Sequence, residues 1–398
     1  MAQTRIVSAP TARTFPDFWT LRQALHLDWA YAAADKRDRR LDVLRGFAVF
    51  AMVVDHWGGA SWFYLITGGN TFFVSAAEAF IFISGLVVGM VYGGIALKQG
   101  LRAAQTKAFH RALTLYKLTV ALTFLFAGVS LFFRLPWASD LQIGNPLTYA
   151  LAVVTLHQTM YLTDIPLMYT FLMLAAPLGL WLLFNRRTGW LVAGSSALWV
   201  AAQLFPAQVQ VPWSLVGSTA FDLAAWQLLF FIAMAIGYHR DALARKLSAI
   251  PRVPYFVFAG LLLVWLVRFH DTNGVILARL VPGLDVQTFL AGFFLKSALA
   301  PGRLIASFIL FQFAYLAITL LWKPIQTFFG WLLLPLGQNA LYSYTMHLAA
   351  IALFSIVLPY LPGTVATMGV VNTSIQLLAV LAIWTMIQRR FLFKIVPR

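Results

Sequence analysis

Three ionisable residues, Arg45, Asp55 and His56, lie within a stretch that otherwise reads as the first membrane-crossing helix. A charge at membrane depth costs roughly 2.5–3.5 kcal/mol on insertion scales, so these residues need a role beyond anchoring. Arg45 and His56 are eleven positions apart. At about 1.5 Å and 100° per residue they lie about 16 Å apart along the axis on nearly the same face. We therefore expect them to line one path through the membrane.

A histidine beside an aspartate suits a general base that accepts a proton from an alcohol, because imidazole titrates near neutral pH. The alternative for His56 is an interfacial pair with Trp57. The alternative for Arg45 is a topology anchor whose side chain snorkels to the surface. Asp42 lies three residues before Arg45, and the two can pair on this helix.

Glu78 lies in the next apolar stretch, flanked by alanine and phenylalanine. A lone carboxylate there must find a cation or stay protonated, so we expect it to pair with His56, Arg45 or another cation. Its alternative is a buried structural salt bridge. Three glycines at every fourth position permit close helix approach and are given a packing role only: Gly85, Gly89 and Gly93.

Asn339, Ser343 and His347 follow i, i+4, i+8 spacing in a later span and form a polar stripe. Such a stripe normally faces protein or water. Asn339, Tyr342 and His347 are the candidate donors to an oxyanion, if the reaction forms one. Interhelical hydrogen bonding alone is the alternative. Further polar groups on the outer side could bind substrate: Gln227, Lys296 and Arg303.

Composition determines the broad class. The 398 residues are 61% hydrophobic and 11% charged, with a mean hydropathy of +0.79. The apolar residues gather in runs of about 20, the length of a membrane span. We predict an all-α polytopic membrane protein, a bundle of about ten transmembrane helices. The predicted spans are 42–58, 71–93, 112–133, 166–184, 189–205, 222–238, 254–268, 303–322, 333–358 and 373–388.

Lys and Arg lie mostly in loops on one side of these spans. By the positive-inside rule that side is cytoplasmic and holds both termini. We expect a cytoplasmic lead-in over 1–40 that is not a signal peptide, a transmembrane domain over 41–390 and a cytoplasmic tail over 391–398. Two longer outer loops are candidates for a substrate mouth, and within them 147–162 and 286–298 are apolar enough for half-helices.

Several classes of function are disfavoured. The net charge of +16 does not indicate nucleic-acid binding, because the basic residues are spread over loops. The chain has no cysteine, and its seven histidines lack a metal-ligand spacing, so no bound metal is expected. A transporter that couples protons through the same intramembrane charges is an alternative to an enzyme, although no internal repeat supports it. A non-catalytic membrane anchor is a third possibility.

Six segments in order along the chain resemble the OpgC family: 39–46, 55–56, 78–85, 225–230, 296 with 303, and 337–347. The resemblance covers about residues 37–390. The wider group of transmembrane acyltransferases shares an arginine, ten residues and then a histidine, and Arg45 and His56 stand at this spacing. The resemblance implies a bacterial inner-membrane enzyme that moves succinyl groups from a cytosolic donor, succinyl-CoA, to osmoregulated periplasmic glucans. No permanently bound cofactor is implied.

Residues and resemblance together suggest how a donor binds. An acyl-CoA would dock at the cytoplasmic mouth, and arginine forks would meet its phosphates bidentately. The candidate donor-binding residues are Arg39, Arg40 and Arg45, with Arg102 or Lys107 in addition.

His56 would take the proton of a glucan hydroxyl, with Asp55 or Glu78 orienting the imidazole. Lys296 or Arg303 would bind the free carboxylate of the donor or an anionic glucan. The expected partners are the acyl-CoA, a periplasmic glucan or other glycan, and the bilayer; a homo-oligomer is left open.

Overall fold

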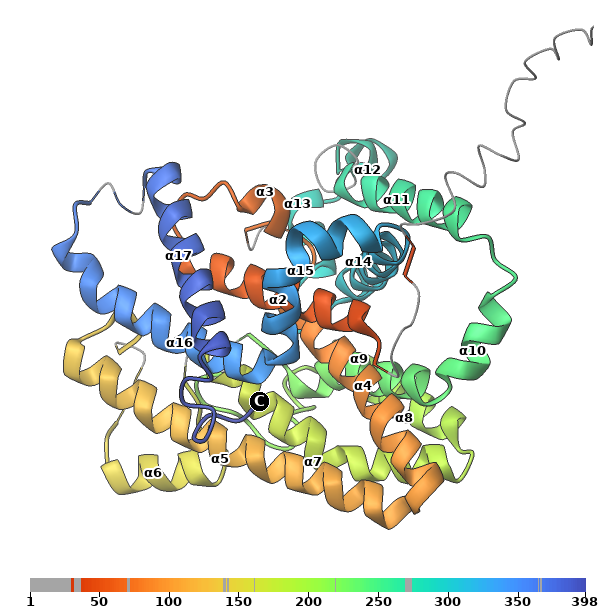
Figure 1. Ribbon diagram of the computed structural model, residues 1–398, viewed down its shortest axis with the longest axis horizontal. Helices are drawn as coiled ribbons and strands as arrows, with labels where there is room; N and C mark the ends of the chain where they lie inside the picture. Colours follow the sequence, from red (N-terminus) through yellow and green to blue (C-terminus); the bar gives the residue numbers. More distant parts are fainter. Residues whose placement is uncertain are drawn as a thin grey trace, which may run out of the picture.

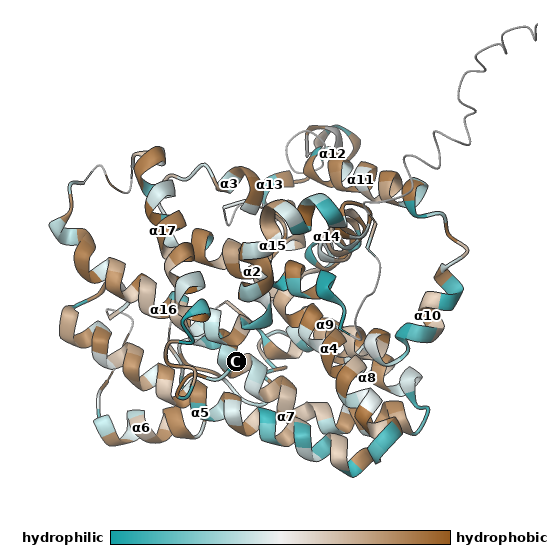
Figure 2. Ribbon diagram, viewed as in Figure 1, coloured by the Kyte–Doolittle hydropathy of each residue, from teal (hydrophilic) through white to brown (hydrophobic). Residues whose placement is uncertain are grey.

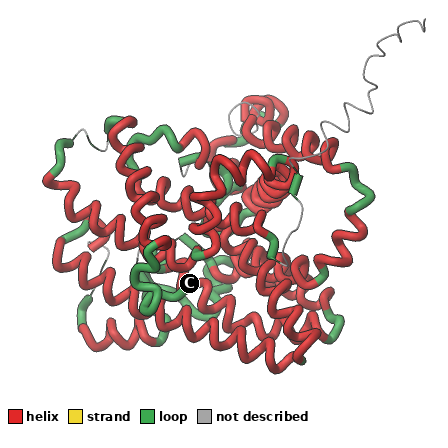
Figure 3. The backbone as a smooth tube through the Cα atoms, in the orientation of Figure 1, coloured by secondary structure: helices red, strands yellow, loops and turns green. Residues whose placement is uncertain are grey.

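The computed structural model describes residues 30–31, 37–69, 72–138, 141, 143–160, 162–218, 220–268, 274–363, 365 and 367–398. Most of the predicted lead-in lies outside these residues. Where the chain is described it consists of helices and loops, with one isolated bridge between Gln158 and Val216 (Figure 3). The all-α prediction is confirmed.

The helices follow one another in the order drawn in Figure 1. The first half contains α2 (Arg39–Trp57), α3 (Tyr64–Thr67), α4 (Ala76–Gln99), α5 (Leu101–Phe133), η1 (Pro136–Ala138), α6 (Pro146–Val154), α7 (Asp164–Phe184) and α8 (Thr188–Leu204). The second half contains α9 (Leu223–Tyr238), α10 (Arg240–Leu247), α11 (Arg252–Arg268), α12 (Gly274–Leu280), α13 (Val286–Phe293), α14 (Pro301–Leu320), α15 (Trp322–Gln338), α16 (Ala340–Val357), η3 (Leu358–Tyr360) and α17 (Gly369–Gln388).

Six of the described helices are long and apolar enough to cross a membrane: α4, α5, α7, α14, α16 continued by η3, and α17. A seventh crossing results if α10 and α11, which meet at a bend of 100°, count as one span. Apolar residues cover most of α11, α16 and α17, while α10 is hydrophilic (Figure 2). A multi-pass membrane protein is supported, but the predicted count of ten crossings is not confirmed.

The difference in count has local causes. Helix α2 falls short of the six because its 19 residues include several charges. The two predicted half-helices form α6 and α13, of nine and eight residues, which are too short to cross. The predicted single span over 333–358 is wrong, because the chain breaks at Asn339 between α15 and α16. The Asn339 amide donates to the carbonyl oxygen of Pro335 at 2.9 Å, which ends α15.

Helix α2 lies in the middle of the bundle, with α4 and α14 on one side and α16 and α17 on the other (Figure 1). It crosses α15 in backbone contact. A Cβ on Gly46 would lie 2.0 Å from the carbonyl oxygen of Leu333, and a Cβ on Gly337 would lie 1.8 Å from that of Asp42. Because only glycine allows so close an approach, these two positions set how α2 is turned within the bundle.

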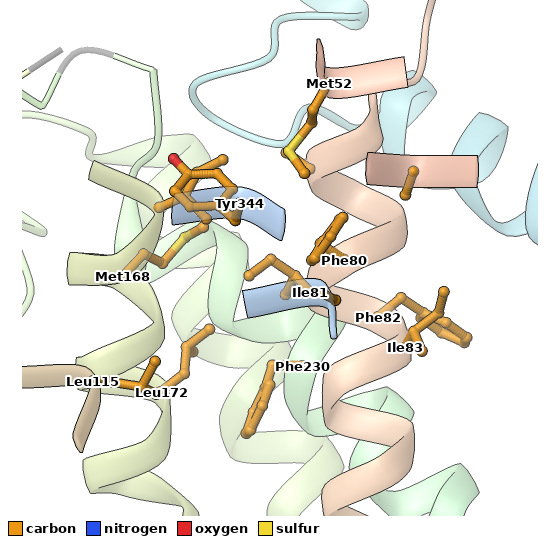
Figure 4. Packing of buried hydrophobic residues seen from close by; sticks show 14 of the residues in the cluster. Met52, Phe80, Ile81, Phe82, Ile83, Leu115, Met168, Leu172, Phe230 and Tyr344 are labelled. Atoms are coloured by element: carbon orange, nitrogen blue, oxygen red, sulfur yellow. The ribbon is translucent and has the colours of Figure 1, made fainter. Parts of the chain in front are cut away.

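Helices α4 and α9 form a second close contact. Cβ atoms on Gly85 and Gly89 would lie 2.1 and 2.0 Å from the carbonyl oxygens of Phe230 and Met234. The packing role predicted for these glycines is confirmed. Around this contact, apolar side chains from α2, α4, α5, α7, α9 and α16 pack together (Figure 4). This core joins the helices that carry the polar residues described next.

Candidate functional site

His56 and His347 meet at the end of α2 and within α16. Nδ1 of His56 lies 3.1 Å from Nε2 of His347, and the ring centroids are 5.3 Å apart. On its other side, Nδ1 of His347 lies 2.5 Å from the carbonyl oxygen of Tyr344. A carbonyl oxygen can only accept, so in the neutral pair His347 carries its hydrogen on Nδ1. Its Nε2 then accepts from the Nδ1–H of His56.

This hydrogen-bond chain leaves Nε2 of His56 with its lone pair, which is the state that a general base requires. The chain also orients the imidazole, and the group that does so is His347. With its Nε2 accepting, His347 has no hydrogen there to offer an oxyanion. Trp57, the other partner considered for His56, packs on Phe354 at 4.4 Å between ring centroids.

The two acids predicted to orient the imidazole have partners of their own. The Asp55 carboxylate accepts from the hydroxyl of Thr67 at 2.7 Å. Glu78 forms a buried ion pair with Nε of Arg303. It also accepts from the backbone N–H and the hydroxyl of Ser75 at 2.9 and 2.6 Å, which completes a capping box at the start of α4. The structural salt bridge considered for Glu78 is therefore present, with Arg303 as the cation.

A small cavity of about 20 Å³ lies beside His56. Roughly 10–15 Å³ of such space holds one water, so the cavity admits about one water-sized group. Asp55, Ser75 and Lys296 line it together with His56. The structure thus brings together three predicted residues from α2 and from the turn between α13 and α14. Arg303, Gln227, Asn339 and Tyr342 do not line this cavity.

The turn that carries Lys296 is held by indole groups of α8 and α9. The Trp226 N–H donates to the carbonyl oxygens of Lys296 and Ser297 at 3.1 and 3.0 Å. The Trp199 N–H donates to the carbonyl oxygen of Leu299 at 3.0 Å. Burial lowers the pKa of Lys296. Sequence reasoning did not find Trp199, because a tryptophan in an apolar helix carries no polar signal.

Two buried amides on α17 hold the end of α2 next to the histidine pair. Asn372 donates to the carbonyl oxygen of Gly58 at 2.7 Å, and Gln376 donates to that of Val54 at 3.3 Å. Buried carbonyls at a helix end need such donors. Sequence reasoning missed both residues, although two amides at i and i+4 in an apolar span form a polar stripe like the one noted in α16.

A second cavity, of about 280 Å³, lies among α2, α4, α5, α7 and α16. Arg45, Arg111 and Arg398 line it, and Nη1 of Arg111 donates to the carbonyl oxygen of Arg398 at 2.8 Å. Ile165 lines both this cavity and the one beside His56, so the two are neighbours. Sequence reasoning missed Arg111 because it lies just outside the predicted span 112–133, whereas in the structure it belongs to α5.

Arg45 has no ion-pair partner among the residues that the structure describes. The pairing with Asp42 that the spacing allows is not formed. Asp42 binds Arg37 through both carboxylate oxygens, each at 2.7 Å, because the segment before α2 brings Arg37 within bidentate reach. Arg45 itself lines the cavity of about 280 Å³.

The other predicted donor-binding residues do not line this cavity. Arg40 is stacked between the rings of Tyr31 and Tyr315, 4.4 Å from each centroid. It also pairs with Asp38 at 2.8 Å. The remaining candidates that do not line it are Arg39, Arg102 and Lys107.

Three further predicted residues make helix contacts. The Tyr342 hydroxyl donates to a carbonyl oxygen of the C-terminal segment at 2.7 Å. The amide of Asn339 caps α15, as described above. Oε1 of Gln227 accepts from the Ser195 hydroxyl at 2.6 Å and so joins α9 to α8. Of these three contacts only that of Gln227 joins two helices, because the Asn339 amide bonds within α15 and Tyr342 bonds to the segment after α17.

Comparison with known proteins gives one finding. The family model described as OpgC protein matches residues 37–391, nearly the whole chain. No curated protein and no solved structure matches. The matched range runs from just before α2 to just after α17 and includes Arg45, His56 and His347. The chain therefore belongs to the OpgC family.

Proposed function

We propose that this protein is a membrane-embedded O-acyltransferase that moves an acyl group, most simply succinyl, from a cytosolic acyl-CoA to a hydroxyl of a periplasmic glucan. Membership of the OpgC family supports acyl transfer as the reaction class. The observation that carries the proposal is the lone pair on Nε2 of His56, which follows from its hydrogen bond to His347. Attack of a hydroxyl on a thioester needs such a base.

In the proposed reaction, Nε2 of His56 takes the proton of the glucan hydroxyl while the hydroxyl oxygen attacks the thioester carbonyl. The C–S bond then breaks, and the imidazolium returns the proton to the departing CoA sulfur. A glucan ester and free CoA result, with no net change in protons. His347 accepts from Nδ1 throughout, as the third member of a catalytic triad supports its histidine.

The donor is proposed to bind in the cavity lined by Arg45 and Arg111. Guanidinium groups match phosphate oxygens in geometry and charge, and Arg45 lacks a carboxylate partner among the described residues. The pantetheine arm would pass Ile165, which borders both cavities. The thioester would thereby reach His56 from the side opposite to the glucan.

Lys296 is proposed to bind the free carboxylate of a succinyl donor. Its position in the lining beside His56 supports this role. Arg303 was the other candidate, but its Nε is bound to the carboxylate of Glu78. A cation that already forms an ion pair with a buried carboxylate attracts a second carboxylate less strongly.

The substitution His56→Ala tests the base. In membranes supplied with succinyl-CoA and glucan, the variant should transfer about 10²–10⁴-fold more slowly and still bind CoA. His157→Ala is the matched control, because His157 is an exposed histidine stacked on Trp213. Transfer at the wild-type rate by folded His56→Ala protein would overturn the proposal.

A second experiment tests the direction of transfer. Reporter tags at both termini should report the cytoplasm, and a tag at Asn145 should report the periplasm, because the basic loops are predicted inside. A periplasmic C terminus would contradict the assignment of the Arg45 cavity to the cytoplasmic side.

A further inference from the structure

A third cavity, of about 770 Å³, lies between α2, α3, α4, α9, α11 and α14. Ligand sites typically measure about 300–1,000 Å³ and combine apolar walls with a few polar groups. The walls here are almost entirely alanine, leucine, isoleucine, valine and phenylalanine. The polar side chains in its lining are Thr67, Ser75, Glu78 and Ser307. We call this cavity the lateral groove.

The lateral groove opens on the outside of the bundle. Ile66, Ile305 and Phe308, which line it, are 60%, 52% and 48% exposed. Two of its walls, α4 and α14, are helices that are apolar enough to cross a membrane. In a bilayer its mouth therefore faces hydrocarbon, and an apolar cavity of this kind stays free of water.

Small side chains hollow out the floor of the lateral groove. Ala48 and Ala51 of α2 are 2% and 5% exposed, and Ala79 of α4 lines the groove with them. One end of the wall is reinforced by a separate apolar cluster in which Phe73 packs with Leu266 and others. The groove is therefore a recess within packed helices, distinct from the ordinary outer face of a spanning helix.

The polar end of the lateral groove adjoins the histidine site. Ser75 and Ala76 line both the groove and the small cavity beside His56. Thr67, also in the groove, donates to the carboxylate of Asp55. A ligand with its apolar part in the groove would have its polar part within this shared boundary.

We propose that the lateral groove binds an aliphatic chain of a membrane lipid and holds the polar head of that lipid at Ser75 and Thr67, next to the His56 cavity. A lipid-borne substrate would then reach His56 from the plane of the bilayer, by a route separate from the donor cavity. Lipid binding goes beyond the proposed acyl transfer and does not require it.

The test is photo-crosslinking in nanodiscs made with a phospholipid that carries a diazirine in its acyl chain, with no acyl-CoA present. Labelled peptides should come from α2, α4 and α14. Ala79→Phe fills the groove and should reduce this labelling about tenfold, or 1.4 kcal/mol of binding. Ala121→Phe adds the same ring to an exposed position of α5 and should leave the labelling unchanged.

A second variant, Ala314→Phe, fills the groove from the α14 wall and gives the same measurement if Ala79→Phe does not fold. Loss of labelling in either folded variant supports the proposal. Unchanged labelling in a folded filled variant, or wild-type labelling spread evenly over all exposed helices, would overturn it. The His56→Ala protein should label normally, so a failure of the acyl-transfer proposal is distinguishable from a failure of this one.

Discussion

Ser75, Glu78 and Arg303 form a closed polar cluster, whereas His56 and Lys296 belong to an open one. In the closed cluster each Glu78 oxygen has a donor within the protein, and the Glu78 and Arg303 side chains are 1% and 7% exposed. In the open cluster His56 and Lys296 line a shared cavity. Both clusters lie near the end of α2, and both contain residues that the sequence singles out.

The comparison separates two uses of buried charge. A buried ion pair with all its partners stabilises mainly by avoiding an unpaired charge, since removing one partner is costly. A buried base with a free lone pair is available for proton transfer. Charge and burial alone therefore do not identify a catalytic residue, because the hydrogen-bond partners must be known as well.

The largest expected effect is on stability and comes from the closed cluster. Arg303→Met leaves the Glu78 carboxylate buried without its cation, so the free energy of unfolding should fall by about 3–5 kcal/mol. Lys296→Met is the matched control from the open cluster and should cost clearly less. Unfolding of the purified proteins in detergent measures both. An equal loss of unfolding free energy in the two variants would contradict the distinction between the clusters.

The next effect concerns donor selectivity. Lys296→Gln should raise the activation free energy of succinyl transfer by about 2–5 kcal/mol relative to that of acetyl transfer. The reason is that only the succinyl group has a free carboxylate. Arg303→Gln should lower both reactions to a similar extent. Competition between succinyl-CoA and acetyl-CoA in membranes measures the ratio. If Lys296→Gln leaves the ratio of succinyl to acetyl transfer unchanged, Lys296 has a role in glucan binding or in the fold instead.

A smaller effect tests His347 as a positioning residue. His347→Leu removes the acceptor for the Nδ1–H of His56 and should reduce kcat about 10²-fold. His347→Gln restores an acceptor oxygen and should recover part of that loss, which a purely structural role would not explain. Steady-state kinetics on both variants gives the comparison. If leucine and glutamine behave alike, the relay through His347 is not needed.

The smallest effect concerns the amides of α17. Gln376→Leu removes the amide that donates to the buried carbonyl oxygen of Val54 near the end of α2 and should cost about 1–2 kcal/mol of stability. Ser374→Ala is the control. Ser374 is exposed and does not bond to a carbonyl of α2, so this change should alter stability by less than about 0.5 kcal/mol. Thermal unfolding distinguishes the two, and a loss for Ser374→Ala as large as for Gln376→Leu would contradict the capping role.

Hydropathy along the sequence determined the helical membrane class and located most helices, because burial in lipid requires long apolar runs. It also selected Arg45, His56, Glu78 and His347, because a polar group in such a run is conspicuous. Hydropathy did not predict the break at Asn339, because the apolar pattern continues through α15 into α16.

The partner of each buried polar group follows from the fold and could not be predicted from the local sequence. From the sequence, Asp42 could pair with Arg45, and Asp55 or Glu78 was expected to orient His56. In the structure His56 binds a residue 291 positions away, and Glu78 binds one 225 positions away. These pairings depend on how α2, α4, α14 and α16 cross, and the crossing depends on packing contacts such as those of Gly46 and Gly337. A local pattern contains no information on which distant helix face it will meet, so the partners of a buried charge follow from the fold.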